Sequence, residues 1–219
     1  PDVRYYLHGL LLENRAGRVR AVATDGHRLA LCDAPFDQET GTDIQIILPR
    51  KAVIELGRLL GDSEVDASFE ISNSHLRVHL EATSFTTKLI DGRFPDYERV
   101  MPTGQPKLVL ADKDALKQAL VRTAILSNEK YRGIRFRLAN GVAHLQAHNP
   151  EQDEAEEEVE VEYGGDEMTI GFNVGYLLDV LGVIDGEQVQ MSVIDSNSST
   201  LLTPNGSDEC RYVVMPMRL

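Results

Sequence analysis

Residues 44–61 read IQIILPRKAVIELGRLLG and join a short apolar strand directly to an amphipathic helix. Pro49 lacks an N–H and has a fixed φ, so it suits the first turn of a helix. Apolar residues recur at helical spacing from 50 to 60, and Gly61 follows as a residue that commonly ends helices. Extended runs come next, at 67–71, 74–80 and 84–89. The stretch therefore predicts a strand–helix–three-strand unit.

The same order of elements recurs in the second half of the chain. Asn173 is placed to cap a helix over 174–184, which strand 168–172 precedes. The strands expected after this helix cover 189–194, 199–202 and 210–215. The two copies share almost no sequence identity, so the repeat is one of element order. We therefore expect an α+β protein with domains at 1–104 and 105–219.

The second half opens with elements that have no counterpart in the first half. A strand over 108–111 leads into a helix from Asp112 to Ser127. The first half instead starts with strands, expected at 4–13, 19–24 and 29–32. We therefore expect the first repeat to be truncated and the chain to be part of a longer protein. The remaining strands of the second half are expected at 134–138, 142–147 and 154–163.

The acidic charge of the chain is concentrated in one segment. The net charge is −13, and residues 151–167 hold ten acids and no base, so the other 202 residues carry only −3. Local basic surfaces for nucleic acid therefore remain possible. Within the segment, Val159 and Val161 alternate with glutamates, which predicts a strand with one acidic face. Such an edge strand prevents aggregation or meets a basic partner.

Compartment and redox state follow from what the sequence lacks. No apolar run reaches the ~20 residues that cross a bilayer, and no signal-peptide pattern begins the chain, so a cytoplasmic location is the default. Cys32 and Cys210 are far apart in sequence and in no metal-like spacing. Free buried thiols are therefore expected, and no disulfide.

Few residues suggest catalysis or metal binding. His144 and His148 are four residues apart, as are His75 and His79, but on a strand residues i and i+4 stand roughly 13 Å apart. A metal site is therefore not expected, and no motif indicates a cofactor. Asp25 beside His27 leaves open one alternative, a two-domain enzyme that uses this pair in an interdomain groove. A turn-stabilising Asp and a surface His are the simpler interpretation.

The chain ends on the apolar sequence YVVMPMRL, residues 212–219. Most termini are polar and frayed, so an apolar end is either docked in the fold or exposed for binding. Pro216 ends the strand, and the two methionines beside it are flexible apolar side chains that adapt to different ligands. A final core strand is the plain alternative.

Motifs spread over the whole chain resemble the bacterial DNA polymerase III beta subunits, the sliding clamps. The motifs are TDGHRL at 24–29, DGRFPDY at 91–97, SNEK at 127–130, FNV at 172–174 and the terminal sequence at 212–219. The match is to the family's second domain without its first strand and helix, and to the whole third domain. The resemblance implies repeated clamp domains, each with two helices packed on antiparallel β-sheets. It also implies a homodimeric ring around duplex DNA, without catalysis of its own, that tethers polymerases to DNA.

The resemblance implies that polymerase subunits, the clamp loader and repair proteins dock short peptides into a pocket between the two domains. Apolar residues would form a cup for a peptide Leu or Phe, and arginines would bond peptide carbonyls and carboxylates. Carried over by motif, the pocket residues are Leu7, Thr24, Gly26, His27, Arg28, Leu29, Pro95, Arg99, Val100, Asn173, Tyr176, Asn197, Ser199, Val213, Val214, Met215, Pro216, Met217 and Arg218.

The resemblance also assigns a DNA surface and a dimer interface. Basic inner helices inside an acidic ring would hold DNA without binding it tightly. The DNA-facing residues would be Arg4, Tyr5, Tyr6, Arg50, Lys51, Lys113, Lys117 and Arg122. The third domain would meet the first domain of another protomer through Ile125, Leu126, Glu154, Glu156 and Glu158. Because no first domain is present, we expect this chain to be monomeric and to bind DNA only weakly.

Overall fold

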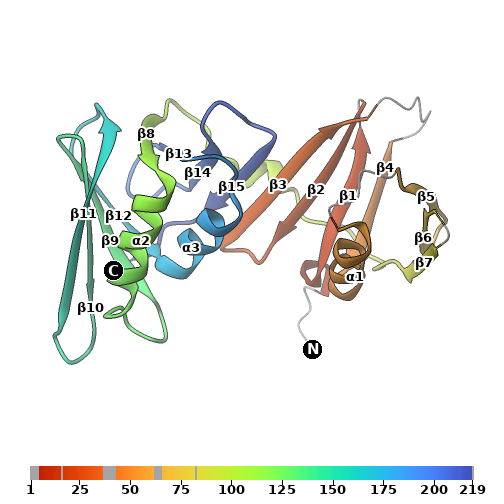
Figure 1. The fold of residues 1–219 in the computed structure, drawn as a ribbon, viewed down its shortest axis with the longest axis horizontal. Coiled ribbons are helices and arrows are strands. Elements are labelled where there is room, and N and C mark those ends of the chain that lie inside the picture. Colours follow the sequence, from red (N-terminus) through yellow and green to blue (C-terminus); the bar gives the residue numbers. More distant parts are fainter. Residues whose placement is uncertain (1–4, 16, 37–42, 62–65, 82, 219) are drawn as a thin grey trace. The chain divides into compact units, whose positions relative to one another are not determined.

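The chain folds into two compact units (Figure 1), and the computed structural model describes residues 5–15, 17–36, 43–61, 66–81 and 83–218. Unit 1 comprises residues 1–25 and 31–97, and unit 2 comprises residues 26–30 and 98–219. Antiparallel sheets and helices build both units, which confirms the α+β class. Contacts between residues within each unit place the division near residue 97. The expected domain boundary at 104 stays a prediction.

Unit 1 contains two sets of paired strands. The first has the order β3-β2-β1-β4, and the second is a three-stranded sheet with the order β5-β6-β7. Leu11 of β1 lies opposite Val22 of β2 and Ile47 of β4. The elements in chain order are η1 Tyr5–His8, β1 Gly9–Arg15, β2 Arg18–Thr24, β3 Arg28–Pro35, β4 Ile44–Pro49, α1 Arg50–Leu60, β5 Ser68–Ile71, β6 His75–Leu80 and β7 Thr83–Lys88.

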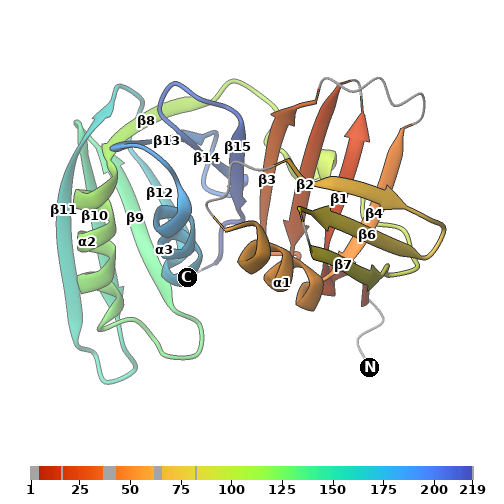
Figure 2. The same cartoon turned by 45° about the vertical axis from the view of Figure 1, so that its right-hand side comes forward.

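Helix α1 lies alongside the β5-β6-β7 sheet (Figure 2), and its apolar side shares one core with both sheets. The buried members of this core are Ile46, Leu48, Leu56, Leu76 and Val78. The helix ends as its sequence predicts: Gly61 has φ 49°, and its N–H donates to the Gly57 carbonyl at 3.0 Å. The bounds 50–60 are therefore confirmed.

The expected strand over 4–13 is wrong in its first half. Tyr5–His8 form a 3-10 helix, and β1 starts only at Gly9. Gly9 pairs with Pro49 of β4, and a Cβ on it would lie 2.5 Å from the Leu48 carbonyl oxygen. Only glycine therefore allows the chain this close to β4, and the strand begins at this position.

A buried polar network fixes the DGRFPDY loop of unit 1. Nε and Nη2 of Arg20 donate to Asp33 at 2.6 and 3.0 Å, and Nη1 donates to the Tyr97 hydroxyl at 3.0 Å. That hydroxyl donates in turn to Glu13. Glu13, Asp33 and Tyr97 are each less than a tenth exposed. Burial, then the bond to Glu13, raises the pKa of Tyr97, and the bonds to Asp33 raise the pKa of Arg20.

Unit 2 is built on one sheet with the order β12-β9-β10-β11-β8-β13-β14-β15. Helices α2 and α3 lie side by side on it (Figure 1). The elements of this unit are η2 Tyr97–Val100, β8 Lys107–Asp112, α2 Lys113–Ala124, β9 Gly133–Ala139, β10 Val142–His148, β11 Glu154–Tyr163, β12 Met168–Asn173, α3 Val174–Val183, β13 Gln188–Val193, β14 Thr200–Pro204 and β15 Cys210–Val214.

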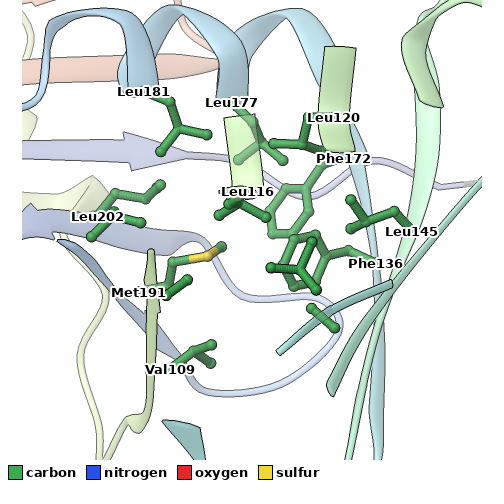
Figure 3. Packing of buried hydrophobic residues seen from close by; sticks show 14 of the residues in the cluster. Val109, Leu116, Leu120, Phe136, Leu145, Phe172, Leu177, Leu181, Met191 and Leu202 are labelled. Carbon is green, nitrogen blue, oxygen red and sulfur yellow. The ribbon is translucent and has the colours of Figure 1, made fainter. Parts of the chain in front are cut away.

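Figure 3 shows the core of unit 2, in which both helices meet the sheet. Leu116 and Leu120 of α2 and Leu177 of α3 are at most 1% exposed. Phe136 and Phe172 pack edge to face, with ring centroids 5.9 Å apart. The core fixes α3, whose exposed side carries the candidate site described next.

Helix α2 begins as expected and ends earlier than expected. The Asp112 carboxylate accepts from the Ala115 N–H at 2.7 Å, which confirms the predicted cap. The helix stops at Ala124 and not at Ser127. The Ser127 N–H and hydroxyl both donate to the Ala124 carbonyl, at 3.2 and 2.8 Å, so a tight turn replaces the last helical turn.

Candidate functional site

The apolar C-terminal segment is held in unit 2 by main-chain hydrogen bonds. Strand β15 is buried from Tyr212 to Val214, as a core strand should be. Beyond it, the Met215 N–H donates to the His27 carbonyl at 3.0 Å, and the Met217 N–H donates to the Gly171 carbonyl at 2.9 Å. Residues 215–217 are nevertheless half-exposed. This tail, residues 215–218, is thus ordered while part of its apolar surface faces solvent.

Residues 26–30 lie against α3 and bring a cation to it. The Arg28 guanidinium forms an ion pair with Asp179 and stands over the Tyr176 ring, 4.5 Å from the guanidinium carbon to the ring centroid. The His27 ring stacks near Tyr176, with centroids 6.5 Å apart and planes inclined by 21°. Leu29 is only 4% exposed and anchors the segment. One aromatic side chain of α3 therefore orients two predicted site residues.

The loop before β14 presents further predicted residues. The Asp195 carboxylate accepts from the N–H groups of Asn197 and Ser198 at 2.8 Å and from the Ser198 hydroxyl at 3.0 Å. These bonds, the Asn197 N–H first, lower the pKa of Asp195. Asn197 is exposed and Ser199 half-buried in this loop. A local turn of main-chain donors around one carboxylate therefore fixes the loop.

Tyr131, which the motifs did not indicate, lies beside the start of α3. The Asn173 side chain caps the helix, accepting from the Gly175 N–H at 2.9 Å, and donates to the Tyr131 carbonyl at 3.3 Å. Tyr131 is 57% exposed, and Lys130 stands 5.0 Å from its ring centroid. The place of Tyr131 directly after the SNEK motif, at 127–130, is the signal in the sequence that points to it.

The other predicted pocket residues are distributed over both units. In unit 2, Gly26 and Arg99 are exposed, Val100 is half-buried, and Arg218 is exposed at the end of the tail. In unit 1, Leu7 and Thr24 are half-buried and Pro95 is exposed. That these three join the unit 2 residues in one pocket stays a prediction.

The predicted DNA-contacting residues differ in exposure and in whether they already pair with a carboxylate. On α1, Arg50 and Lys51 are exposed; on α2, Lys113 and Lys117 are half-buried. Arg122 is exposed but donates twice to Glu157 of β11, at 2.7 and 2.8 Å. Tyr6 is half-buried in η1, the side chain of Tyr5 is not described, and Arg4 lies outside the described residues.

Strand β11 carries the expected acidic face at an open edge. It pairs with β10 from Glu154 to Glu160, but β8 covers its other edge only at Val161–Tyr163. Glu154, Glu156 and Glu158 are exposed. At the end of α2, Ile125 is 75% exposed and Leu126 is half-buried. Acidic and apolar groups thus stand beside main-chain groups of β11 that, among the described strands, have no partner on this edge.

Three other expectations concern metal, cysteines and membranes. Within the described residues, no three His, Cys, Asp or Glu side chains are grouped so as to hold a metal ion. Neither Cys32 nor Cys210 is a free thiol, so that expectation is wrong; neither the spacing of cysteines in a sequence nor an assumed compartment determines their redox state. No helix in the described part of the chain is both long and apolar enough to span a membrane.

Comparison with known proteins places this geometry in one family. A family model for the central domain of the DNA polymerase III beta subunit matches residues 1–96, and one for its C-terminal domain matches residues 98–218. The beta sliding clamp of Pseudomonas putida KT2440 is 58% identical over 220 residues, which cover 100% of this chain and 59% of the relative. That of Escherichia coli K12 is 49% identical over 218 residues, with the same coverage.

Solved structures of similar fold belong to the same family. A crystal structure of the sliding clamp from Pseudomonas aeruginosa bound to griselimycin has a TM-score of 0.97 and 55% identity, and the match covers 100% of this chain and 59% of that chain. The chain spans about 59% of the length of the curated relatives it matches. It belongs to the DNA polymerase III beta subunit family, the bacterial sliding clamps, and corresponds to their central and C-terminal domains.

Proposed function

We propose that this chain is part of a DNA sliding clamp, a processivity factor that tethers polymerases to duplex DNA in the cytoplasm and catalyses no reaction. Membership of the clamp family supports this function. The alternative, an enzyme using Asp25 and His27, has less support, because His27 is turned to the Tyr176 ring and Asp25 is exposed. A tether needs docking surfaces and no reacting groups.

We place the partner-binding site of unit 2 on residues 26–30, the start of α3 and the tail. The observation that carries this assignment is the tail itself, bonded to His27 and Gly171 through its main chain while its apolar side chains stay half-exposed. Flexible thioethers accept different apolar side chains, and arginine bonds peptide carbonyls. Short linear peptides of polymerases, the clamp loader and repair proteins are the proposed ligands.

A peptide titration tests this assignment. A short fluorescent peptide with a Gln-Leu motif should bind with about micromolar affinity, because ordering an extended segment offsets much of the burial. Griselimycin, bound in the Pseudomonas aeruginosa clamp structure, should displace it. Met215→Ala and Arg28→Ala should each weaken binding by roughly ten-fold or more. A peptide with Ala in place of the motif Leu is the control. No binding by the wild-type chain, or binding by both variants as tight as that of the wild-type chain, removes the site.

DNA contact is proposed for the basic residues of α1 and α2. Arg50, Lys51, Lys113 and Lys117 supply charges on these helices, and Arg122 contributes less because Glu157 already balances it. Contact with phosphates alone is weak and falls steeply with salt. Stable association with DNA therefore requires the closed ring, and this chain should bind duplex DNA only weakly.

The open edge of β11 is the proposed dimer contact. Its charge favours pairing with a different strand over pairing with β11 of a second copy. Two such edges would bring Glu154, Glu156 and Glu158 of one copy against those of another, and facing like charges are destabilising. A basic strand would complement the edge. We therefore expect this chain to be monomeric by light scattering at about 150 mM salt. A stable dimer that Glu156→Lys disrupts would contradict this expectation.

A further inference from the structure

The ion pair of Arg28 with Asp179 is a feature of unit 2 that the pocket motifs do not include. The two residues are far apart in sequence, and both side chains reach solvent: that of Arg28 is 35% exposed and that of Asp179 is 66% exposed. Tyr176 lies one turn before Asp179 on α3 and covers a face of the guanidinium. Helix α3 thus holds Arg28 from two sides.

Asp179 is the only charged residue of α3, whose sequence is VGYLLDVLGV. Aspartate is a poor helix former, and this one makes no cap, because Asn173 caps the helix. Leu177 and Val180 beside it are buried, whereas the Asp179 side chain faces solvent and adds nothing to the core. What it contacts is Arg28, a residue of the proposed peptide site.

We propose that Asp179 is a positioning residue that sets the charge preference of the peptide site through Arg28. The carboxylate holds the guanidinium on Tyr176 and cancels most of its charge at the surface. A peptide carboxylate approaching Arg28 meets the negative charge of Asp179 as well, whereas a main-chain carbonyl or a side-chain amide meets a donor without net repulsion. The site therefore selects peptides that are neutral at the position facing Arg28.

This inference deepens the proposed peptide-binding function and rests on it. The energy involved is that of one charge a few ångströms from another at a partly exposed site, which corresponds to roughly three- to ten-fold in binding. Selection by a repulsive group is a common way to exclude wrong partners. Acidic residues at this peptide position would be disfavoured although an arginine is present.

The test uses matched peptides that differ by one charge. In a Gln-Leu motif peptide, each position in turn carries Gln or Glu, and the Gln/Glu affinity ratio is measured for the wild-type chain and for Asp179→Asn. At the position facing Arg28, the substitution should lower the ratio by roughly three- to ten-fold. The change should shrink at about 500 mM salt, because the charges are exposed. Asp208→Asn, which removes an exposed charge from the 205–209 loop of unit 2, should leave every ratio unchanged.

Two further variants separate charge from structure. Asp179→Glu should restore most of the wild-type ratio, and in an Arg28→Gln background Asp179→Asn should change it less than about two-fold. If Asp179→Asn weakens Gln and Glu peptides equally, or leaves the ratio unchanged at every position, the inference is overturned while peptide binding stands. If the wild-type chain binds no peptide, the proposed function fails first.

Discussion

Removing residues 215–219 should reduce peptide binding by roughly 100-fold or more while lowering the melting temperature by no more than about 5 °C. The tail contributes half-exposed apolar side chains, whereas strand β15 before it is buried and remains intact. The deletion removes the main-chain hydrogen bonds from Met215 to His27 and from Met217 to Gly171. Isothermal titration with the Gln-Leu peptide and differential scanning calorimetry measure the two effects on the same sample.

A replacement variant distinguishes the contribution of the tail's side chains from that of its main chain. Replacing residues 215–219 by a Gly-Ser segment of equal length keeps main-chain donors but removes the thioethers. This variant should bind peptide as poorly as the deletion does. If it binds normally, main-chain groups and not Met215 or Met217 recognise the peptide. If the deletion unfolds unit 2, the tail belongs to the core and the plain interpretation of a final core strand is correct.

Arg20→Ala should destabilise unit 1 by about 3–5 kcal/mol at pH 7. The substitution leaves Glu13 and Asp33, both less than a tenth exposed, without their shared cation. Uncompensated buried charge is costly. Urea unfolding of the variant and of the wild-type chain at pH 7 measures the loss of stability.

Arg58→Ala is the matched control for this prediction. Arg58 also belongs to unit 1 and also pairs with a carboxylate, that of Glu55, but its side chain is 73% exposed. Exposed pairs contribute little to stability. The control should therefore unfold at nearly the same urea concentration as the wild-type chain. Equal losses for Arg20→Ala and Arg58→Ala would mean that the buried network does not stabilise unit 1.

The sequence predicts those helix ends that are set by a residue at the end itself. Pro49 and Gly61 define α1, and Asp112 caps α2, because each acts through its own backbone or the next turn. The end of α2 was placed too late, since Leu126 continues the apolar spacing while the Ser127 turn stops the helix. Periodicity does not register such a turn.

Local sequence patterns cannot predict contacts between residues that are far apart in the sequence. Arg20 meets Tyr97 across 77 residues, and Arg28 meets Asp179 across 151. No pattern within a window of the chain links these pairs. The tail was identified from composition, because an apolar terminus is unusual by itself. Asp179 could not be identified in this way, since its role depends on the side chain that it faces.

Residues 26–30 have a consequence for dissecting this protein. The polypeptide leaves unit 1 after Asp25, supplies five residues to unit 2 and returns to unit 1 at Leu31. Expression of residues 98–218, the span of the C-terminal family model, would therefore omit His27 and Arg28 and leave Tyr176 and Asp179 without the groups they contact. Under the proposed assignment of the peptide site, its residues come from two separate stretches of the sequence. A fragment cut at the boundaries of the C-terminal family model is then too short to bind the peptide.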